Sequence, residues 1–169
     1  EWGVIGEQIA IGAIKYSVLK VGTGSDAAFD IGKSVSLEGN SGPYLQYTYA
    51  RTQSVLRKSG VSEVSGLLRH VHKIERGLAM TRAKEELDLL RMLVRFEDVV
   101  RGAAEKYSPN IIANYLFELA QVFNLFYQKL PIIKEGTQVR EFRLVLAQGA
   151  GKVVRIGLDL LGIKAPDRM

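Results

Sequence analysis

Residues 37–51 read Leu37-Glu38-Gly39-Asn40-Ser41-Gly42-Pro43-Tyr44-Leu45-Gln46-Tyr47-Thr48-Tyr49-Ala50-Arg51. This stretch decides the fold because it contains a complete helix start. Ser41 suits the N-cap, where its hydroxyl accepts a hydrogen bond from a free backbone N–H, and Pro43 falls in the first turn, where a missing N–H does no harm. We expect the helix to end near Gly60, after two basic residues that complement the negative end of the helix.

The expected helix has two faces of different chemistry. With about 100° of rotation per residue, one face is predicted to pack in the core and carries Leu45, Tyr49, Thr52 and Leu56. Another face mixes aromatic and basic side chains, at Tyr44, Tyr47, Arg51, Val55 and Lys58. The second face is therefore the candidate for a binding function.

The rest of the chain reads as helices with short breaks, which is typical of an all-α bundle. Further helices are predicted over about 81–103, with a bend near 95–96, and over 138–161. Between them, Ser108 is predicted to cap a helix that has Pro109 in its first turn and runs to 130. The helix that ends at 130 carries a wide apolar arc, as expected of a central helix that packs on several neighbours. Gly149 and Gly151 are predicted points of close packing, and residues 61–80 form a connector whose structure the pattern does not define.

Residues 1–40 have a less regular helical pattern than residues 41–169. They hold one helix-like segment, 7–19, followed by a glycine-containing turn at 21–26. We therefore predict two parts, a connecting region over 1–40 and a helical bundle over 41–169.

The composition narrows the class of protein. Hydrophobic residues make up 47% and charged residues 24%, as in an ordinary globular domain, and no apolar run reaches the roughly 20 residues of a membrane span. The absence of cysteine excludes disulfides and thiolate metal sites, and permits a reducing compartment. The net charge of +5 fits a polyanionic partner without requiring one. The chain opens at Glu1-Trp2 rather than at methionine, which we expect of a piece of a longer protein.

Three runs of the sequence resemble one known family. Residues 37–51 resemble the L-E-G-N-T-G-P-Y-x-Q-Y-A-x-A-R signature of arginyl-tRNA synthetases. Residues 113–121 and 157–169 are similar to the A-N-Y-L-x-x-L-A and G-L-x-L-L-G-I-x-A-P-E-R-M runs of the same family, whose chains end at the methionine that matches Met169. The resemblance spans nearly the whole chain. It implies the anticodon-binding helical bundle of class I aminoacyl-tRNA synthetases over 41–169, preceded by the C-terminal end of the catalytic domain over 1–40.

The resemblance also implies an activity for the parent protein, namely the ATP-dependent attachment of arginine to its tRNA during protein synthesis in the cytoplasm. Members of the family bind ATP with an H-I-G-H-type signature and a K-M-S-K-S-like loop, and neither motif occurs in these 169 residues. We therefore expect this chain to have no catalytic residues and to be inactive alone, with ATP and magnesium held elsewhere in the parent enzyme. The expected partner is tRNA specific for arginine, with no membrane contact, and the expected state is a monomer.

Aromatic residues beside positive charge supply the candidate site. Unstacked RNA bases are read by stacking on aromatic rings, while cations follow the phosphates. In the resembling family, the positions that match Tyr44, Tyr127 and Met169 line the pocket for anticodon bases. Weaker candidates are Tyr47, Arg51, Asn114, Gln121 and Gln128. Where the family sometimes has a further aromatic residue, this chain has Pro131. The alternative for each tyrosine is packing in the helical core.

Two other groups of residues have simpler interpretations than metal binding or catalysis. His70 and His72, near Glu75, form an i, i+2 pair, but without cysteine or a third histidine we interpret them as solvated surface residues, and predict no metal site. The acids Glu85, Glu86 and Asp88 stand at helical spacings from basic residues, which favours an ion-paired, solvated helix face over acid–base chemistry. The basic residues are Arg82, Lys84 and Arg91. A helical protein–protein interaction module without affinity for RNA remains the alternative function, and binding to arginine tRNA distinguishes the two.

Overall fold

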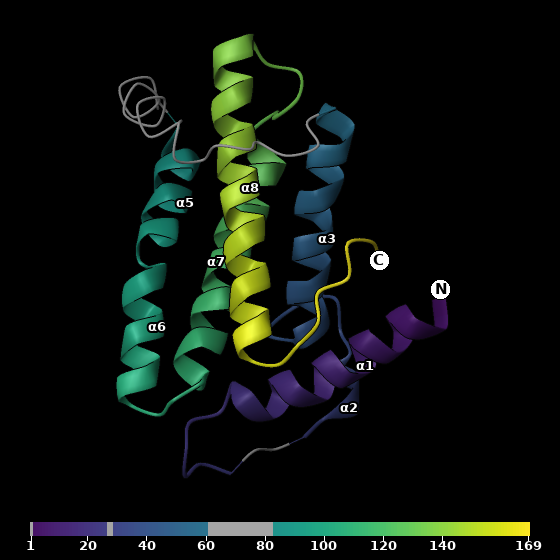
Figure 1. Ribbon diagram of the computed structural model, residues 1–169. Helices are drawn as coiled ribbons and strands as arrows, with labels where there is room; N and C mark the ends of the chain where they lie inside the picture. The colour runs from purple at the N-terminus through teal and green to yellow at the C-terminus, as the bar shows by residue number, and fades with distance from the viewer. Residues whose placement is uncertain (1, 27–28, 61–82) are drawn as a thin grey trace.

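The computed structural model describes residues 2–26, 29–60 and 83–169, and these residues form helices joined by turns and loops (Figure 1). The connector predicted over 61–80, with His70 and His72, lies outside the described residues. The helices are α1 (Trp2–Leu19), α2 (Ile31–Ser34), α3 (Gly42–Ser59), α5 (Lys84–Val94), α6 (Phe96–Glu105), α7 (Asn110–Lys129) and α8 (Thr137–Leu160). No strand occurs among the described residues, which confirms the prediction of an all-α fold.

Helix α3 begins and ends as its sequence predicts. The hydroxyl oxygen of Ser41 accepts a hydrogen bond of 3.2 Å from the backbone N–H of Tyr44, and Pro43 lies in the first turn. Gly60 ends the helix in the left-handed conformation, with φ of 74°, a region that glycine enters without steric cost. Of the predicted core face, Leu45, Tyr49 and Thr52 are buried and Leu56 is partly buried.

The bundle consists of α3, α7, α8 and the collinear pair α5 and α6, while α1 crosses its foot (Figure 1). The break between α5 and α6 falls at Arg95, where the bend was predicted. Helix α7 is central: it packs on α5, α6, α8 and α3. Its buried arc includes Leu116, Leu119, Phe123 and Phe126.

Glycine permits the close approach of α8 to its neighbours. A Cβ atom at Gly151 would lie only 2.4 Å from Oγ1 of Thr52 on α3, and one at Gly149 would lie 3.1 Å from Cδ1 of Leu93 on α5. Both predicted close-packing points are therefore confirmed. A side chain at Gly151 would push α3 and α8 apart.

Two local predictions are wrong. Ser108 does not cap α7, because its hydroxyl instead donates to the carbonyl of Lys106 (2.9 Å), and the helix begins at Asn110 after Pro109. Glu86 does not lie on a solvated face. It is buried, and its Oε1 accepts a bond of 2.6 Å from Nε of Arg143 on α8. Asp88 forms the expected ion pair within its own helix, with Arg91, whereas Glu85 pairs with Lys129 on α7.

Helix α1 is joined to the bundle by polar side chains of its own and of α3. The hydroxyl of Tyr16 is within hydrogen-bonding distance of Oδ1 of Asn40 (2.6 Å) and the carbonyl of Ala113 (2.9 Å), and burial raises its pKa. Nε2 of Gln46, on α3, donates to the carbonyls of Gln8 and Lys164. These contacts connect α1, α3 and the segment after α8. None of the described helices combines the length and apolar character needed to span a bilayer.

Candidate nucleic-acid interface

A guanidinium group between two aromatic rings forms the centre of the candidate interface. The guanidinium carbon of Arg51, on α3, lies 4.7 Å from the ring centroid of Tyr47 and 5.2 Å from that of Tyr127, on α7. A cation placed over aromatic rings at these distances is attracted by their negative faces. The predicted aromatic and basic stripe of α3 therefore meets a tyrosine from a second helix.

A hollow of about 480 Å³ opens beside this cluster. It is lined by Tyr47, Ala50, Arg51, Ser54, Arg57, Lys58, Tyr127, Arg168 and Met169. Four of these side chains are cations and none is an acid, so the hollow presents positive charge together with aromatic surface. Such a combination suits a nucleobase that stacks on a ring while its phosphate lies beside a cation.

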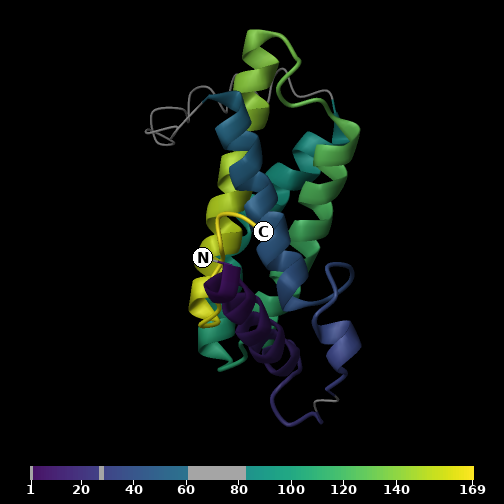
Figure 2. The same ribbon diagram turned by 90° about the vertical axis from the view of Figure 1, so that its right-hand side faces the viewer.

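The segment after α8 brings Met169 to this hollow. It turns back at Gly162 and runs along α3 (Figures 1 and 2). Asp167 is held at both ends: its Oδ1 accepts a hydrogen bond of 2.8 Å from the hydroxyl of Tyr49, and its carbonyl accepts one of 3.1 Å from Nη1 of Arg57. Burial raises the pKa of Tyr49, and the bond to Asp167 raises it further, so the hydroxyl stays a donor at neutral pH.

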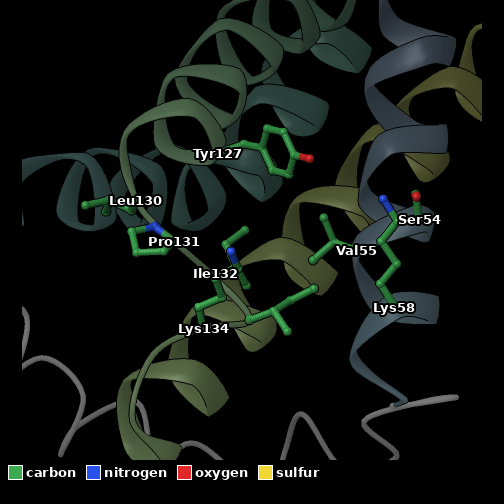
Figure 3. Close-up of a pocket in the computed structure, with 9 residues that line it drawn as sticks. Ser54, Val55, Lys58, Tyr127, Leu130, Pro131, Ile132 and Lys134 are labelled. Carbon is green, nitrogen blue, oxygen red and sulfur yellow. The ribbon is translucent and has the colours of Figure 1, made fainter.

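A second, smaller hollow of about 270 Å³ lies against Tyr127. Its lining consists of Ser54, Val55, Lys58, Tyr127, Leu130, Pro131, Ile132, Ile133 and Lys134, mostly apolar side chains with lysines among them (Figure 3). Tyr127, Ser54 and Lys58 line both hollows. Tyr127, which is 39% exposed, thus borders two recesses that could each receive a flat apolar group.

Arg143 holds the loop that forms one wall of the second hollow. Its Nη1 donates to the carbonyl of Pro131 (2.7 Å), and Glu135 lies 3.4 Å away. Arg143 is itself fixed by the buried carboxylate of Glu86. A buried ion pair therefore sets the position of residues 131–136 relative to Tyr127.

The structure gathers four of the eight predicted site residues in one place: Tyr47, Arg51, Tyr127 and Met169 all line the larger hollow. Tyr44 does not line it. Its ring packs edge-on against Phe117 at a centroid distance of 5.8 Å, and its hydroxyl accepts a bond from Asn124. Asn114 is exposed towards the N-terminal end of α7 and is likewise not part of the hollow.

Sequence reasoning missed Asn124 and Asp167. Oδ1 of Asn124 accepts a bond of 2.5 Å from Nη1 of Arg51, and Asn124 is buried. The available signal for Asn124 was its place in the sequence: it is a polar residue next to the apolar arc of a central helix, three positions before Tyr127. No group of three or more potential metal ligands occurs among the described residues.

Comparison with known proteins places this chain in a family. The family model of the DALR anticodon binding domain matches residues 45–169. The arginine–tRNA ligase of Bacteroides thetaiotaomicron is 40% identical over 162 residues, which are 95% of this chain and 26% of that protein. The arginine–tRNA ligase of Pyrococcus abyssi is 39% identical over 98% of this chain and 25% of its own length.

A solved structure agrees with these sequence relatives. The arginyl-tRNA synthetase of Thermus thermophilus superposes with a TM-score of 0.83 at 33% identity, over 96% of this chain and 27% of that one. This chain spans about a quarter of the length of the relatives that it matches. The predicted resemblance to arginyl-tRNA synthetases and the predicted helical-bundle fold are confirmed, and the chain belongs to the DALR anticodon-binding domain family.

Proposed function

We propose that this chain recognises the anticodon of tRNA specific for arginine, as a module of an arginine–tRNA ligase. The observation that carries the proposal is the arrangement of Tyr47, Arg51 and Tyr127 at the edge of a hollow with four cationic side chains. Anticodon bases are unstacked and splayed, so they can enter such hollows and stack on a tyrosine. Each stacked base contributes on the order of 1–3 kcal/mol of binding free energy.

The two hollows suit two parts of one RNA loop. The larger hollow, with Arg57, Lys58 and Arg168, offers contacts to phosphates as well as to a base. The smaller one is mainly apolar and suits the face of a second base. Met169 gives the larger hollow a flexible, polarisable wall that adapts to an irregular contact. Pro131, in the smaller hollow, offers further apolar contact to such a base.

The role of the module follows from the parent enzyme that we propose. Binding here selects the tRNA and positions its acceptor end at a catalytic site in the part of the protein outside these 169 residues, where ATP and magnesium are bound. Residues 1–40 then complete the catalytic domain, and 41–169 form the anticodon-binding bundle. The parent works as a monomer in the cytoplasm.

The test is direct binding of the 169-residue chain to arginine tRNA. Affinity is measured by gel shift or fluorescence anisotropy at about 50 and 200 mM salt, with an arginine tRNA of altered anticodon as the matched control. We expect binding that weakens strongly with salt, because every phosphate contact releases counterions, and that is tighter for the unaltered anticodon. Without binding at low salt the protein–protein alternative is favoured. Charging of tRNA with arginine by the chain alone would contradict the assignment of catalysis to the rest of the protein.

A further inference from the structure

Asn124 is a buried polar side chain between the two helices that form the candidate interface. It is 8% exposed, lies on α7, and contacts three residues of α3. Its Oδ1 accepts a hydrogen bond of 2.5 Å from Nη1 of Arg51. Its Nδ2 donates to the hydroxyl of Tyr44 (2.9 Å) and to Oγ1 of Thr48 (3.2 Å).

The chemistry of the partners fixes the orientation of the Asn124 amide. A guanidinium has no acceptor, so Arg51 can face only the amide oxygen. The hydroxyl of Thr48 already donates to the carbonyl of Tyr44 (2.9 Å), so towards Asn124 its oxygen is an acceptor. The nitrogen must therefore face Thr48 and Tyr44, and both of its hydrogens are used. A flipped amide would place donor against donor at Arg51.

This network determines where the Arg51 guanidinium lies. Tyr47 and Tyr127 both contact the guanidinium through their rings, and Asn124 holds one nitrogen from a third direction. Among the described residues no other hydrogen bond from Arg51 occurs, so its remaining N–H groups are available to the hollow that it lines. A planar donor group with fixed orientation suits an acceptor-bearing base edge or a phosphate.

We propose that Asn124 is a positioning residue for the Arg51 guanidinium, and that it contributes to RNA affinity without contacting RNA. This inference rests on the proposed function for its role in binding, but the positioning itself is a property of the free protein. Tyr44 then acts through the same network: its hydroxyl orients Asn124, and its ring packs on Phe117 rather than stacking on a base.

The first test uses the free protein. The Nε–H resonance of Arg51 is expected to be shifted upfield by the two tyrosine rings in an ¹⁵N–¹H spectrum of the 169-residue chain. In Asn124→Leu, which removes the acceptor and keeps the branched shape of the side chain, this resonance is expected to move towards the position of exposed arginines. An unchanged Arg51 resonance in a folded Asn124→Leu variant would overturn the inference, whether or not the chain binds RNA.

The second test is a double-mutant cycle on affinity for arginine tRNA. Loss of a hydrogen bond to a charged group predicts about tenfold weaker binding for Asn124→Leu. In the background of Arg51→Met, the same substitution is expected to change affinity less than about twofold, because a residue that acts through Arg51 has nothing left to position. Equal weakening in both backgrounds would indicate a structural role and overturn the proposal.

Thr48→Val serves where Asn124→Leu fails to fold, as judged by circular dichroism and thermal unfolding. Thr48 is fully buried, and valine has nearly the same shape without the acceptor oxygen. The expected loss of affinity is smaller, about three- to fivefold, because Tyr44 still accepts from Nδ2. The same cycle with Arg51→Met then decides the matter. If the unaltered chain binds no arginine tRNA, the proposed function fails, and the Arg51 resonance still tests the positioning.

Discussion

The hydroxyl of Tyr49 donates a hydrogen bond of 2.8 Å to Oδ1 of Asp167, a residue 118 positions further along the chain. Tyr49 is otherwise part of the buried face of α3, at 2% exposure, so this bond ties the segment after α8 to the core of the bundle. The carbonyl of the same aspartate is held by Arg57. Met169 reaches the larger hollow because the two residues of α3 fix the chain just before it.

Replacing Tyr49 by phenylalanine is expected to weaken tRNA binding by releasing the segment that carries Arg168 and Met169. The loss of one buried hydrogen bond costs about 0.5–1.5 kcal/mol of unfolding free energy. Tyr115→Phe is the matched control, since it also removes a buried hydroxyl, which donates to the carbonyl of Met92 (2.7 Å) far from the hollow. Urea unfolding and tRNA affinity are measured for both. Equal tRNA affinity in the two variants would contradict the role of the Tyr49–Asp167 bond.

Local features of the fold could be predicted from the sequence, because they depend on a few neighbouring residues. Ser41 and Gly60 define the ends of α3 through capping chemistry, and Gly151 marks a close approach because it interrupts an otherwise helical run. Ser108 looks like an equally good cap. In the structure the backbone N–H of Ser108 bonds back to the carbonyl of Ala103 in α6, Tyr107 has a positive φ of 50°, and Pro109 takes the N-cap position of α7.

Contacts between distant segments could not be predicted in the same way. The helical spacing of Glu86 to Leu89, Leu90 and Leu93 puts it on the apolar face of α5. Its partner could not be predicted, because Arg143 is 57 positions away. The grouping of Tyr47, Arg51 and Tyr127 was suggested by chemistry and family resemblance, but the network through Asn124 follows only from the packing of α3 on α7.

Replacing Tyr127 by alanine is expected to weaken binding of arginine tRNA by about 1–3 kcal/mol, because the ring borders both hollows. Its exposure of 39% predicts a smaller loss of stability than the 3–5 kcal/mol that removal of a core aromatic side chain costs. Tyr127→Phe keeps the ring and should retain most of the affinity. A large drop in Tm with unchanged affinity for Tyr127→Ala would restore the interpretation that this residue only packs in the core.

Removing the charge of Arg143 is expected to destabilise the protein strongly. Arg143→Met leaves the carboxylate of Glu86 buried without its partner, which costs on the order of 3–5 kcal/mol. The double variant Glu86→Leu/Arg143→Met removes both charges and should recover much of this loss. Urea unfolding is measured for the unaltered chain, Arg143→Met and the double variant. If the double variant is no more stable than Arg143→Met, the loss of stability comes mainly from the lost bond to the Pro131 carbonyl rather than from the unpaired Glu86.

Stability is expected to fall at alkaline pH because burial raises the pKa of several tyrosines, and Tyr115 contributes part of this fall. Burial raises its pKa to about 12, above the value near 10 of an exposed tyrosine. Between these values the folded state binds a proton that the unfolded state has lost, so unfolding free energy decreases by about 1.4 kcal/mol per pH unit for this group, having been constant below pH 10. In urea unfolding from pH 9 to 11, the unfolding free energy should decrease less steeply with pH for Tyr115→Phe than for the unaltered chain. Parallel profiles would contradict the assignment.

Shortening the side chain of Met169 is expected to impair anticodon recognition more than stability. Met169 lines the larger hollow beside Tyr47 and Tyr127, and its thioether can adapt to the face of a base. Met169→Leu keeps the apolar volume and should preserve most of the affinity, whereas Met169→Ala should reduce it. Binding to arginine tRNA is compared with binding to a variant altered at the second anticodon base, and Tm is recorded for each protein. If Met169→Ala leaves the preference between the two RNAs unchanged, Met169 has no part in reading that base, and its contact with the bundle serves only to cover the end of the hollow.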